Sequence, residues 1–252
     1  MKYIAIIPAR YASTRFPGKP LAQLAGRPIV ERVYERVQTV FDDTYVATDD
    51  PRIADCVTSF GGKAVMTGSH HRSGTDRCAE ALERVGGHAD VVVNVQGDEP
   101  FIDVTQLTAI KECFETDEQT QIATLVKPFD PTTDSWATLS NPNSPKVVID
   151  NHSNALYFSR SVIPYFRGEA PEQWLNKHTY YKHIGLYAYR ADVLRAITRL
   201  SPSPLEVAES LEQLRWLSAG YTIKVRQTNV ETVGIDTPDD LLRAEQYLKS
   251  HA

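Results

Sequence analysis

The chain lacks the features that mark exported, membrane-spanning or nucleic-acid-binding proteins. Its three cysteines, Cys56, Cys78 and Cys113, form no C-x-x-C pair, which argues against a disulfide framework or a cysteine-based zinc site. It has no N-terminal signal segment and no run of about 18 apolar residues, so we expect neither export nor a membrane span. Its 27 basic and 32 acidic residues give a net charge of −5, which disfavours a broad basic face for nucleic acid. We therefore expect a cytoplasmic protein.

Several familiar site motifs are missing as well. A Walker A loop has Ser or Thr directly after its Lys, but Pro20 follows Lys19. The same motif needs a glycine five residues before Gly18, where Ser13 stands. No dinucleotide fingerprint or nucleophile elbow is present, and the adjacent His70–His71 pair is unlike H-E-x-x-H. Zinc and covalent catalysis are disfavoured, and we interpret the two histidines as polar loop residues.

An apolar run and a cationic loop stand at the start of the chain. Residues 3–7 are apolar and rich in β-branched side chains, as expected of a central strand in a parallel sheet. The loop that follows carries Arg10, Arg15 and Lys19 with two hydroxyls and a glycine. Arginine offers a planar fork of donors to phosphate, and lysine a compact charge. The sequence predicts a nucleotide site here; the alternative is a basic surface loop.

Strand and helix patterns alternate in the first part of the chain. Pro28 is expected in the first turn of the first helix. Strands are predicted at residues 3–7, 44–48, 63–66 and 90–96, and helices at residues 28–40, 51–56 and 75–85. This alternation indicates an α/β fold with a doubly wound, mostly parallel, Rossmann-like sheet.

The pattern changes from about residue 130. Residues 146–150 and 155–158 predict antiparallel strands, and residues 166–182 form an arm without clear period. Strands are then predicted at residues 184–189 and 221–225, and helices at residues 205–219 and from 237 onward. We expect a single domain over residues 1–252, with residues 130–190 as an inserted, smaller antiparallel subdomain.

Two aspartates stand where predicted strands give way to helices. Asp98 follows the strand at residues 90–96, and Asp236 precedes the last helix. Mg²⁺ prefers carboxylate oxygens together with phosphate oxygens and water, so the two acids are candidates for one metal site. Either acid could instead be a turn former or a helix cap, but Thr237 offers an alternative cap that would leave Asp236 for the metal. Residues 67–77 form a second polar loop, which could edge a base or phosphate pocket.

Several blocks of the sequence together resemble one enzyme family. Residues 8–19 resemble the signature loop of sugar nucleotidyltransferases, and in this form that of the 3-deoxy-manno-octulosonate (Kdo) cytidylyltransferase family. Further blocks match in the same order, at residues 71–77, 94–100, 157–164, 183–189, 205–206 with 209–215, and 234–241. The CMP-sialic acid synthetases have a similar first loop, but are not expected to carry the blocks at residues 157–164 and 205–215. The resemblance covers essentially the whole chain.

The resemblance implies an activity and its requirements. The family transfers CMP from CTP to the anomeric hydroxyl of Kdo, with Mg²⁺, giving CMP-Kdo and pyrophosphate for lipopolysaccharide biosynthesis. It also implies a homodimer, with the arm and the subdomain around it in sugar binding and subunit pairing. The alternatives are a cytidylyltransferase for 8-amino-Kdo or sialic acid, and a non-catalytic CTP-binding regulator.

The resemblance also assigns roles to individual residues. CTP contacts are expected from Arg10, Ser13, Arg15, Lys19, Arg72, Ser73, Gly74 and Gln96, and sugar contacts from Gln96, Arg160, His183, Tyr187, Glu209 and Gln213. The catalytic residues are expected to be Arg15 and Lys19, on the departing pyrophosphate, with Asp98 and Asp236, on magnesium. Arg160 would bind the sugar carboxylate. Tyr187 could instead be a core residue, and Glu209 with Gln213 a solvated pair on one helix.

Overall fold

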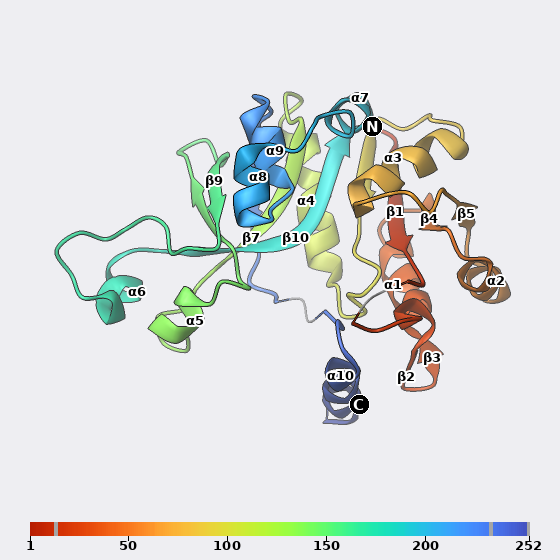
Figure 1. Cartoon of the computed structure of the whole chain (residues 1–252), viewed down its shortest axis with the longest axis horizontal. Helices are drawn as coiled ribbons and strands as arrows, with labels where there is room; N and C mark the ends of the chain where they lie inside the picture. Colours follow the sequence, from red (N-terminus) through yellow and green to blue (C-terminus); the bar gives the residue numbers. More distant parts are fainter. Residues whose placement is uncertain (13–14, 232–233, 251–252) are drawn as a thin grey trace. The chain divides into compact units, whose positions relative to one another are not determined.

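The computed structural model describes residues 1–12, 15–231 and 234–250 and divides into two compact units (Figure 1). The first unit is Met1–Thr108 with Ala188–Thr198 and Thr232–Ala252, and the second is Ala109–Tyr187 with Arg199–Glu231. The second unit contains most of the predicted insertion together with flanking segments on both sides. The assignment of one domain with an insertion stays a prediction.

The first unit contains a parallel sheet with helices between its strands. Its strands follow the order β6-β1-β4-β5, and every neighbouring pair is parallel. The strands are β1 (Tyr3–Ala9), β4 (Thr44–Thr48), β5 (Ala64–Met66) and β6 (Val91–Asn94), with the small antiparallel pair β2 (Gln23–Leu24) and β3 (Arg27–Pro28). The helices are η1 (Lys19–Leu21), α1 (Ile29–Gln38), α2 (Pro51–Ser59), α3 (Gly74–Arg84), α7 (Ala191–Ile197) and α10 (Pro238–Ser250). The predicted α/β class with a mostly parallel sheet is confirmed.

The local sequence explains where these helices begin. In α1, Ile29, Val33 and Val37 are fully buried, so the apolar stripe packs into the core as its spacing predicts. Pro28 lies at the end of β3, in the N-cap position directly before the helix. Its predicted place in the first turn of the helix is therefore wrong. At α2, the Asp50 carboxylate accepts the N–H of Arg52 at 2.9 Å, which is an N-cap bond.

The second unit combines parallel and antiparallel strands. Its order is β11-β7-β10, in which β11 and β7 are parallel, while β8 pairs antiparallel with both β9 and β10. The strands are β7 (Ile122–Pro128), β8 (Lys146–Ile149), β9 (Ala155–Ser159), β10 (Tyr181–Arg190), which ends in the first unit, and β11 (Ile223–Gln227). The helices are α4 (Val104–Thr116), which starts in the first unit, α5 (Trp136–Ser140), η2 (Pro171–Gln173), α6 (Trp174–Lys177), α8 (Pro204–Glu209) and α9 (Gln213–Ser218). The predicted antiparallel strands are thus confirmed.

The predicted helix over residues 205–219 is wrong in one respect. The chain forms two short helices, because Ser210 takes a left-handed conformation with a φ of 51° and ends α8. This conformation interrupts the helical backbone, although apolar residues keep their helical spacing on both sides of the break.

The arm at residues 166–182 carries a small aromatic cluster. Trp174 is 3% exposed and packs with Phe129, Leu139 and Tyr180. Short helices η2 and α6 present this tryptophan, and periodicity could not reveal elements of three and four residues. In the described part of the chain, no helix combines the length and hydropathy needed to cross a membrane.

Candidate active site

The N-terminal loop is closed by contacts around Gly18. The Gly18 N–H donates to the Tyr11 carbonyl at 2.9 Å, and the φ of Gly18 is +71°, a conformation that favours glycine. A Cβ at this position would lie 3.1 Å from the Tyr11 ring. The guanidinium of Arg52 covers that ring, 3.4 Å from its centroid. These contacts join Tyr11 to Gly18, next to the cations Arg10 and Lys19.

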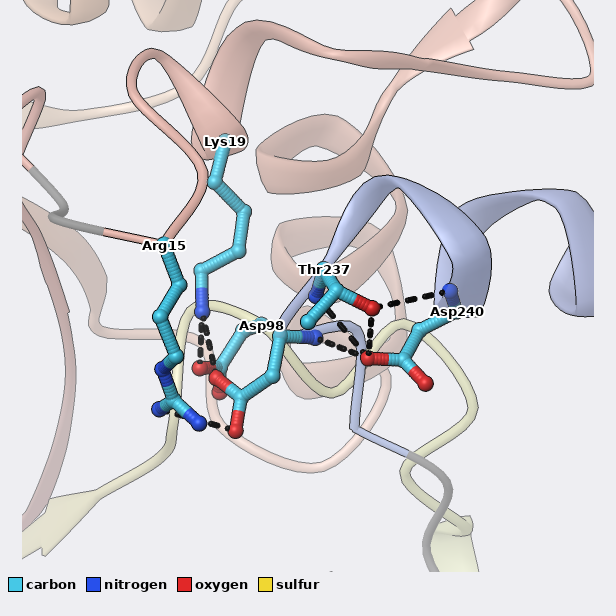
Figure 2. Close-up of polar contacts among 6 residues, drawn as sticks. Arg15, Lys19, Asp98, Thr237 and Asp240 are labelled. Carbon is cyan, nitrogen blue, oxygen red and sulfur yellow. Dashed lines mark hydrogen bonds and ion pairs between the residues drawn. The ribbon is translucent and has the colours of Figure 1, made fainter.

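Lys19 joins the two predicted metal-binding acids (Figure 2). Its Nζ donates to Oδ2 of Asp98 at 2.5 Å and to Oδ1 of Asp236 at 3.1 Å. Arg15 Nη2 lies 3.0 Å from the other oxygen of Asp236. Lys19 is 13% exposed, whereas the outer cation Arg15 is 67% exposed. The expectation that Asp98 and Asp236 lie together at one site is confirmed, and their binding of a metal stays a prediction.

Asp98 is positioned by the end of β6. The preceding Gly97 lies so close to β1 that a Cβ there would be 2.9 Å from the Pro8 carbonyl oxygen. The backbone N–H of Ile235 donates to the Asp98 carbonyl at 2.9 Å. A strand end and a C-terminal segment therefore hold Asp98 from both sides.

Asp236 is left available because a neighbouring residue caps α10. Thr237 Oγ1 accepts the N–H of Asp240 at 3.2 Å, and Asp240 Oδ2 accepts the N–H of Thr237 at 2.8 Å (Figure 2). Hydrogen bonds from Thr237 and Arg243 lower the pKa of Asp240 to about 2, so this acid stays ionised. Thr237 is the cap, as the alternative from the sequence proposed, and Asp236 faces Lys19.

A cavity of about 270 Å³ opens beside this cluster, within the first unit. Apart from Ser13, which lies outside the described residues, every predicted CTP contact lines it. These residues are Arg10, Arg15, Lys19, Arg72, Ser73, Gly74 and Gln96, together with Asp98 and Asp236. A concave site with several cations and two acids suits a polyphosphate that carries a divalent metal.

The second polar loop forms another wall of the cavity. Ser73 Oγ accepts the Asp76 N–H at 3.1 Å and so caps α3. A Cβ on Gly74 would lie 3.2 Å from the Pro8 ring, which shows how closely the start of α3 approaches the end of β1. The positive end of the α3 dipole is therefore near the place predicted for the nucleotide.

The structure adds two cavity residues that the sequence placed only generally, in the polar loop at residues 67–77. Arg77 and His71 also line the cavity. Arg77 is 4% exposed and donates to Thr67 Oγ1 at 2.6 Å, while its Nη2 lies 3.4 Å from Asp49. An arginine in a helix pattern usually indicates a solvated face, so only packing could reveal this burial.

Glu99 is a second addition. Burial, with a smaller contribution from the charge of Asp98, raises the pKa of Glu99 to about 8. Its Oε2 is buried and accepts no hydrogen bond from the described residues. A carboxyl in this state is protonated at neutral pH, so it does not add a third negative charge to the acid pair.

The acid pair suits magnesium. Both carboxylates reach a single lysine nitrogen, so one cation can contact both of them. Their oxygens are hard ligands, and part of each side chain is exposed, at 29% for Asp98 and 45% for Asp236, which leaves room for water and phosphate oxygens.

Two of the predicted sugar-binding residues are joined in the second unit. The Glu209 carboxylate accepts from Ser159 Oγ at 2.6 Å and from the Arg160 N–H at 2.9 Å. The Arg160 guanidinium donates to the carbonyls of Glu209, Pro142 and Ser210 at 2.6, 2.9 and 3.3 Å. All three nitrogens of the Arg160 guanidinium thus donate to backbone oxygens, which fixes its orientation.

The other predicted sugar residues are largely buried. His183 contacts Thr124 Oγ1 at 3.2 Å and the Tyr187 ring, and burial lowers its pKa to about 4, so it is neutral. Tyr187 is 7% exposed and packs edge-on against Trp216. Gln213 is 4% exposed and belongs to α9, so the proposed solvated pair with Glu209 on one helix is wrong. Gln96, the remaining candidate, lines the cavity of the first unit.

Known proteins match this chain over its length. Residues 4–225 match the family model described as cytidylyltransferase. A 3-deoxy-manno-octulosonate cytidylyltransferase of Phocaeicola vulgatus is 66% identical over 249 residues, covering 99% of this chain and 98% of that protein. The protein of the same name from Bacteroides thetaiotaomicron is 63% identical over 253 residues, covering 100% of each.

A solved structure matches as well. It is described as CMP:2-keto-3-deoxy-manno-octonic acid synthetase complexed with CTP, and it aligns with a TM-score of 0.91 and 41% identity over 100% of both chains. The chain belongs to the 3-deoxy-manno-octulosonate cytidylyltransferase family.

Proposed function

We propose that this enzyme transfers CMP from CTP to the anomeric hydroxyl of Kdo, releasing pyrophosphate. The observation that carries the proposal is the cluster in which Lys19 bridges Asp98 and Asp236 at the wall of a cation-lined cavity. The names of the relatives, and the CTP complex of the similar structure, support the choice of both substrates.

Positioning and charge neutralisation are the main contributions of the protein. The sugar hydroxyl would attack the α-phosphorus in line, with pyrophosphate leaving on the opposite side. Arg10, Arg15 and Lys19 stand where they can bind the phosphate oxygens as negative charge moves to the leaving group. Magnesium held by Asp98 and Asp236 would neutralise phosphate charge and favour ionisation of the attacking hydroxyl.

Arg160 is the proposed anchor for the sugar carboxylate. Its three bonds to carbonyl oxygens use three of the five N–H donors that an arginine carries, so its fork is oriented but still has donors for a ligand. His183, Tyr187, Glu209, Gln213 and Gln96 are proposed to contact the sugar hydroxyls.

A pyrophosphate-release assay tests the proposal. CTP and UTP are each combined with Kdo, 8-amino-Kdo or sialic acid, with and without Mg²⁺. We expect release only with CTP, Mg²⁺ and Kdo, and loss of release in Asp98→Asn but not in Asp239→Asn, a matched change of an exposed acid on α10. CTP binding without release would support a regulator instead, and faster release with another acid sugar would replace Kdo as the substrate.

We also propose that the enzyme is a homodimer that uses the arm and the strands around it. Leu156 on β9 is 59% exposed and Tyr165 is 75% exposed, so apolar surface is available there. Sedimentation velocity should show a dimer that Leu156→Asp weakens, whereas Leu242→Asp, on a leucine that is 58% exposed in α10, should not. A monomeric wild type would refute this. Supply of CMP-Kdo to lipopolysaccharide biosynthesis and a cytoplasmic location stay predictions.

A further inference from the structure

Three metal-ligating side chains meet beside the cavity but outside the acid pair. His70 and His71 lie in the loop between β5 and α3, and Glu80 lies on α3. One ligand atom from each lies within 4.8 Å of the others. His71 Nε2 contacts Glu80 Oε2 directly, and the two imidazole rings are 4.4 Å apart. Adjacent histidines cannot share one helical face, but a loop allows both rings to turn toward the same carboxylate.

Gly68 makes room for this arrangement. Its N–H donates to Glu80 Oε2 at 2.9 Å. A Cβ on Gly68 would lie 2.5 Å from Nδ1 of His70 and 3.4 Å from Glu80 Oε2, so any larger residue would displace the imidazole. The absence of a side chain at this position therefore lets His70 approach the carboxylate.

The Glu80 carboxylate is held in place with one oxygen toward His71. This oxygen, Oε2, accepts the N–H of Gly68 and contacts His71 Nε2. Arg84 Nε donates to the other oxygen, Oε1, at 2.7 Å. Oε2 thus presents a carboxylate oxygen within reach of both imidazoles.

We propose that His70, His71 and Glu80 form a site for Zn²⁺, separate from the magnesium site at Asp98 and Asp236. Two imidazole nitrogens and one carboxylate oxygen are a ligand set for zinc and similar transition metals, whereas Mg²⁺ prefers oxygen ligands alone. Water would complete a tetrahedral shell. Since His71 also lines the cavity, the bound ion lies next to the proposed nucleotide site.

Direct metal binding tests this proposal without any use of turnover. The protein without CTP is titrated calorimetrically with Zn²⁺, and with Co²⁺ while its visible absorption is recorded. We expect one ion per chain and a Co²⁺ spectrum typical of tetrahedral coordination. His70→Ala should weaken binding at least about tenfold, by analogy with the loss caused by disturbing a metal shell.

Two further variants sharpen the test. Gly68→Ala keeps all three ligands but displaces His70, so it should also weaken binding. His88→Ala removes an exposed histidine elsewhere in the first unit and should leave binding unchanged. Binding that is equal in wild type and His70→Ala would place the ion elsewhere, for instance at the acid pair, and would overturn the proposal. Absence of binding to the wild type would overturn it too.

Discussion

Lys19 belongs to a cluster of four charged side chains, with Arg15, Asp98 and Asp236. Its ammonium group contacts both acids, and Arg15 contacts the second of them, so the two cations balance the two carboxylates. Because Lys19 is mostly buried, its interaction with these acids is screened less by solvent than a surface ion pair would be. The same ammonium can follow negative charge onto a leaving phosphate, since its four-carbon stem is flexible.

Replacing Lys19 tests its part in the chemical step. Lys19→Ala should lower kcat by about 10²-fold or more, because it removes charge that is matched to the leaving group. Steady-state kinetics with CTP and Kdo measure this effect, and Lys2→Ala, at an exposed lysine, serves as control. A change confined to the KM for CTP would mean that Lys19 only binds CTP and does not assist the chemical step.

His183 predicts a pH dependence of stability. Burial holds its pKa near 4 in the folded chain, against an ordinary value of 6.5. As the pH falls below about 6.5, this histidine takes up a proton in the unfolded chain but not in the folded one. The free energy of unfolding therefore falls between about pH 6.5 and pH 4, by at most about 3 kcal/mol, and is unaffected by this group above that range. Urea unfolding from pH 7 to pH 4 should show a flatter profile for His183→Gln than for wild type. His152→Gln, at an exposed histidine, is the control and should follow the wild-type profile. Equal profiles for His183→Gln and wild type would contradict the prediction.

At the level of single residues, the sequence predicted the cationic loop and the acid pair because both adjoin recognisable strands. Chain position placed Asp98 after a predicted strand and Asp236 before the last helix, while their shared contact with Lys19 depends on the tertiary fold. The burial of Arg77 and of the Glu99 carboxyl escaped prediction, because no local sequence pattern shows it.

The break between α8 and α9 shows a limit at the level of elements. Apolar residues recur at helical spacing through Leu211, Leu214 and Leu217, and neither glycine nor proline interrupts them. Ser210 nevertheless ends α8 in a left-handed conformation, and its carbonyl accepts from Arg160. A tertiary contact that periodicity cannot detect accompanies the break. Residues 101–129, where α4 and β7 lie, carry no element predicted from the sequence.

Substitutions at Ser210 test this conformation. Ser210→Val should lower the free energy of unfolding by about 1–2 kcal/mol, because β-branched residues fit the left-handed region poorly. Ser210→Gly should stay within about 0.5 kcal/mol of wild type, because relief of strain offsets the greater freedom of the unfolded chain. Chemical unfolding measures both values. Equal losses in the two variants would mean that the serine side chain, rather than the backbone, matters.

Across the whole molecule, the two groups of predicted ligand contacts fall into different units. Among the described residues, all those predicted to contact CTP lie in the first unit. The residues predicted to contact the sugar, other than Gln96, lie in the second. The alternation of strands and helices predicted the first unit well. The second depends on antiparallel pairings between short strands and on η2 and α6, which have weak signals in sequence.

This distribution predicts how ligands stabilise the protein. CTP with Mg²⁺ at 100 times its Kd should stabilise the folded state by about 2.7 kcal/mol, seen as a higher Tm. Arg160→Ala should keep this shift, because its contacts lie in the second unit. Asp98→Asn should lose the part that depends on Mg²⁺. An unchanged Mg²⁺ increment in Asp98→Asn would remove that residue from the metal site.

The hydrogen bond from Ile235 to Asp98 ties the C-terminal segment to the end of β6. The matched family region ends at residue 225, before Ile235, Asp236 and α10. A protein truncated after residue 231 would therefore retain Lys19 and Asp98 yet lack the carboxylate that Lys19 also contacts. Premature termination late in the reading frame would leave the N-terminal loop in place and still remove half of the acid pair.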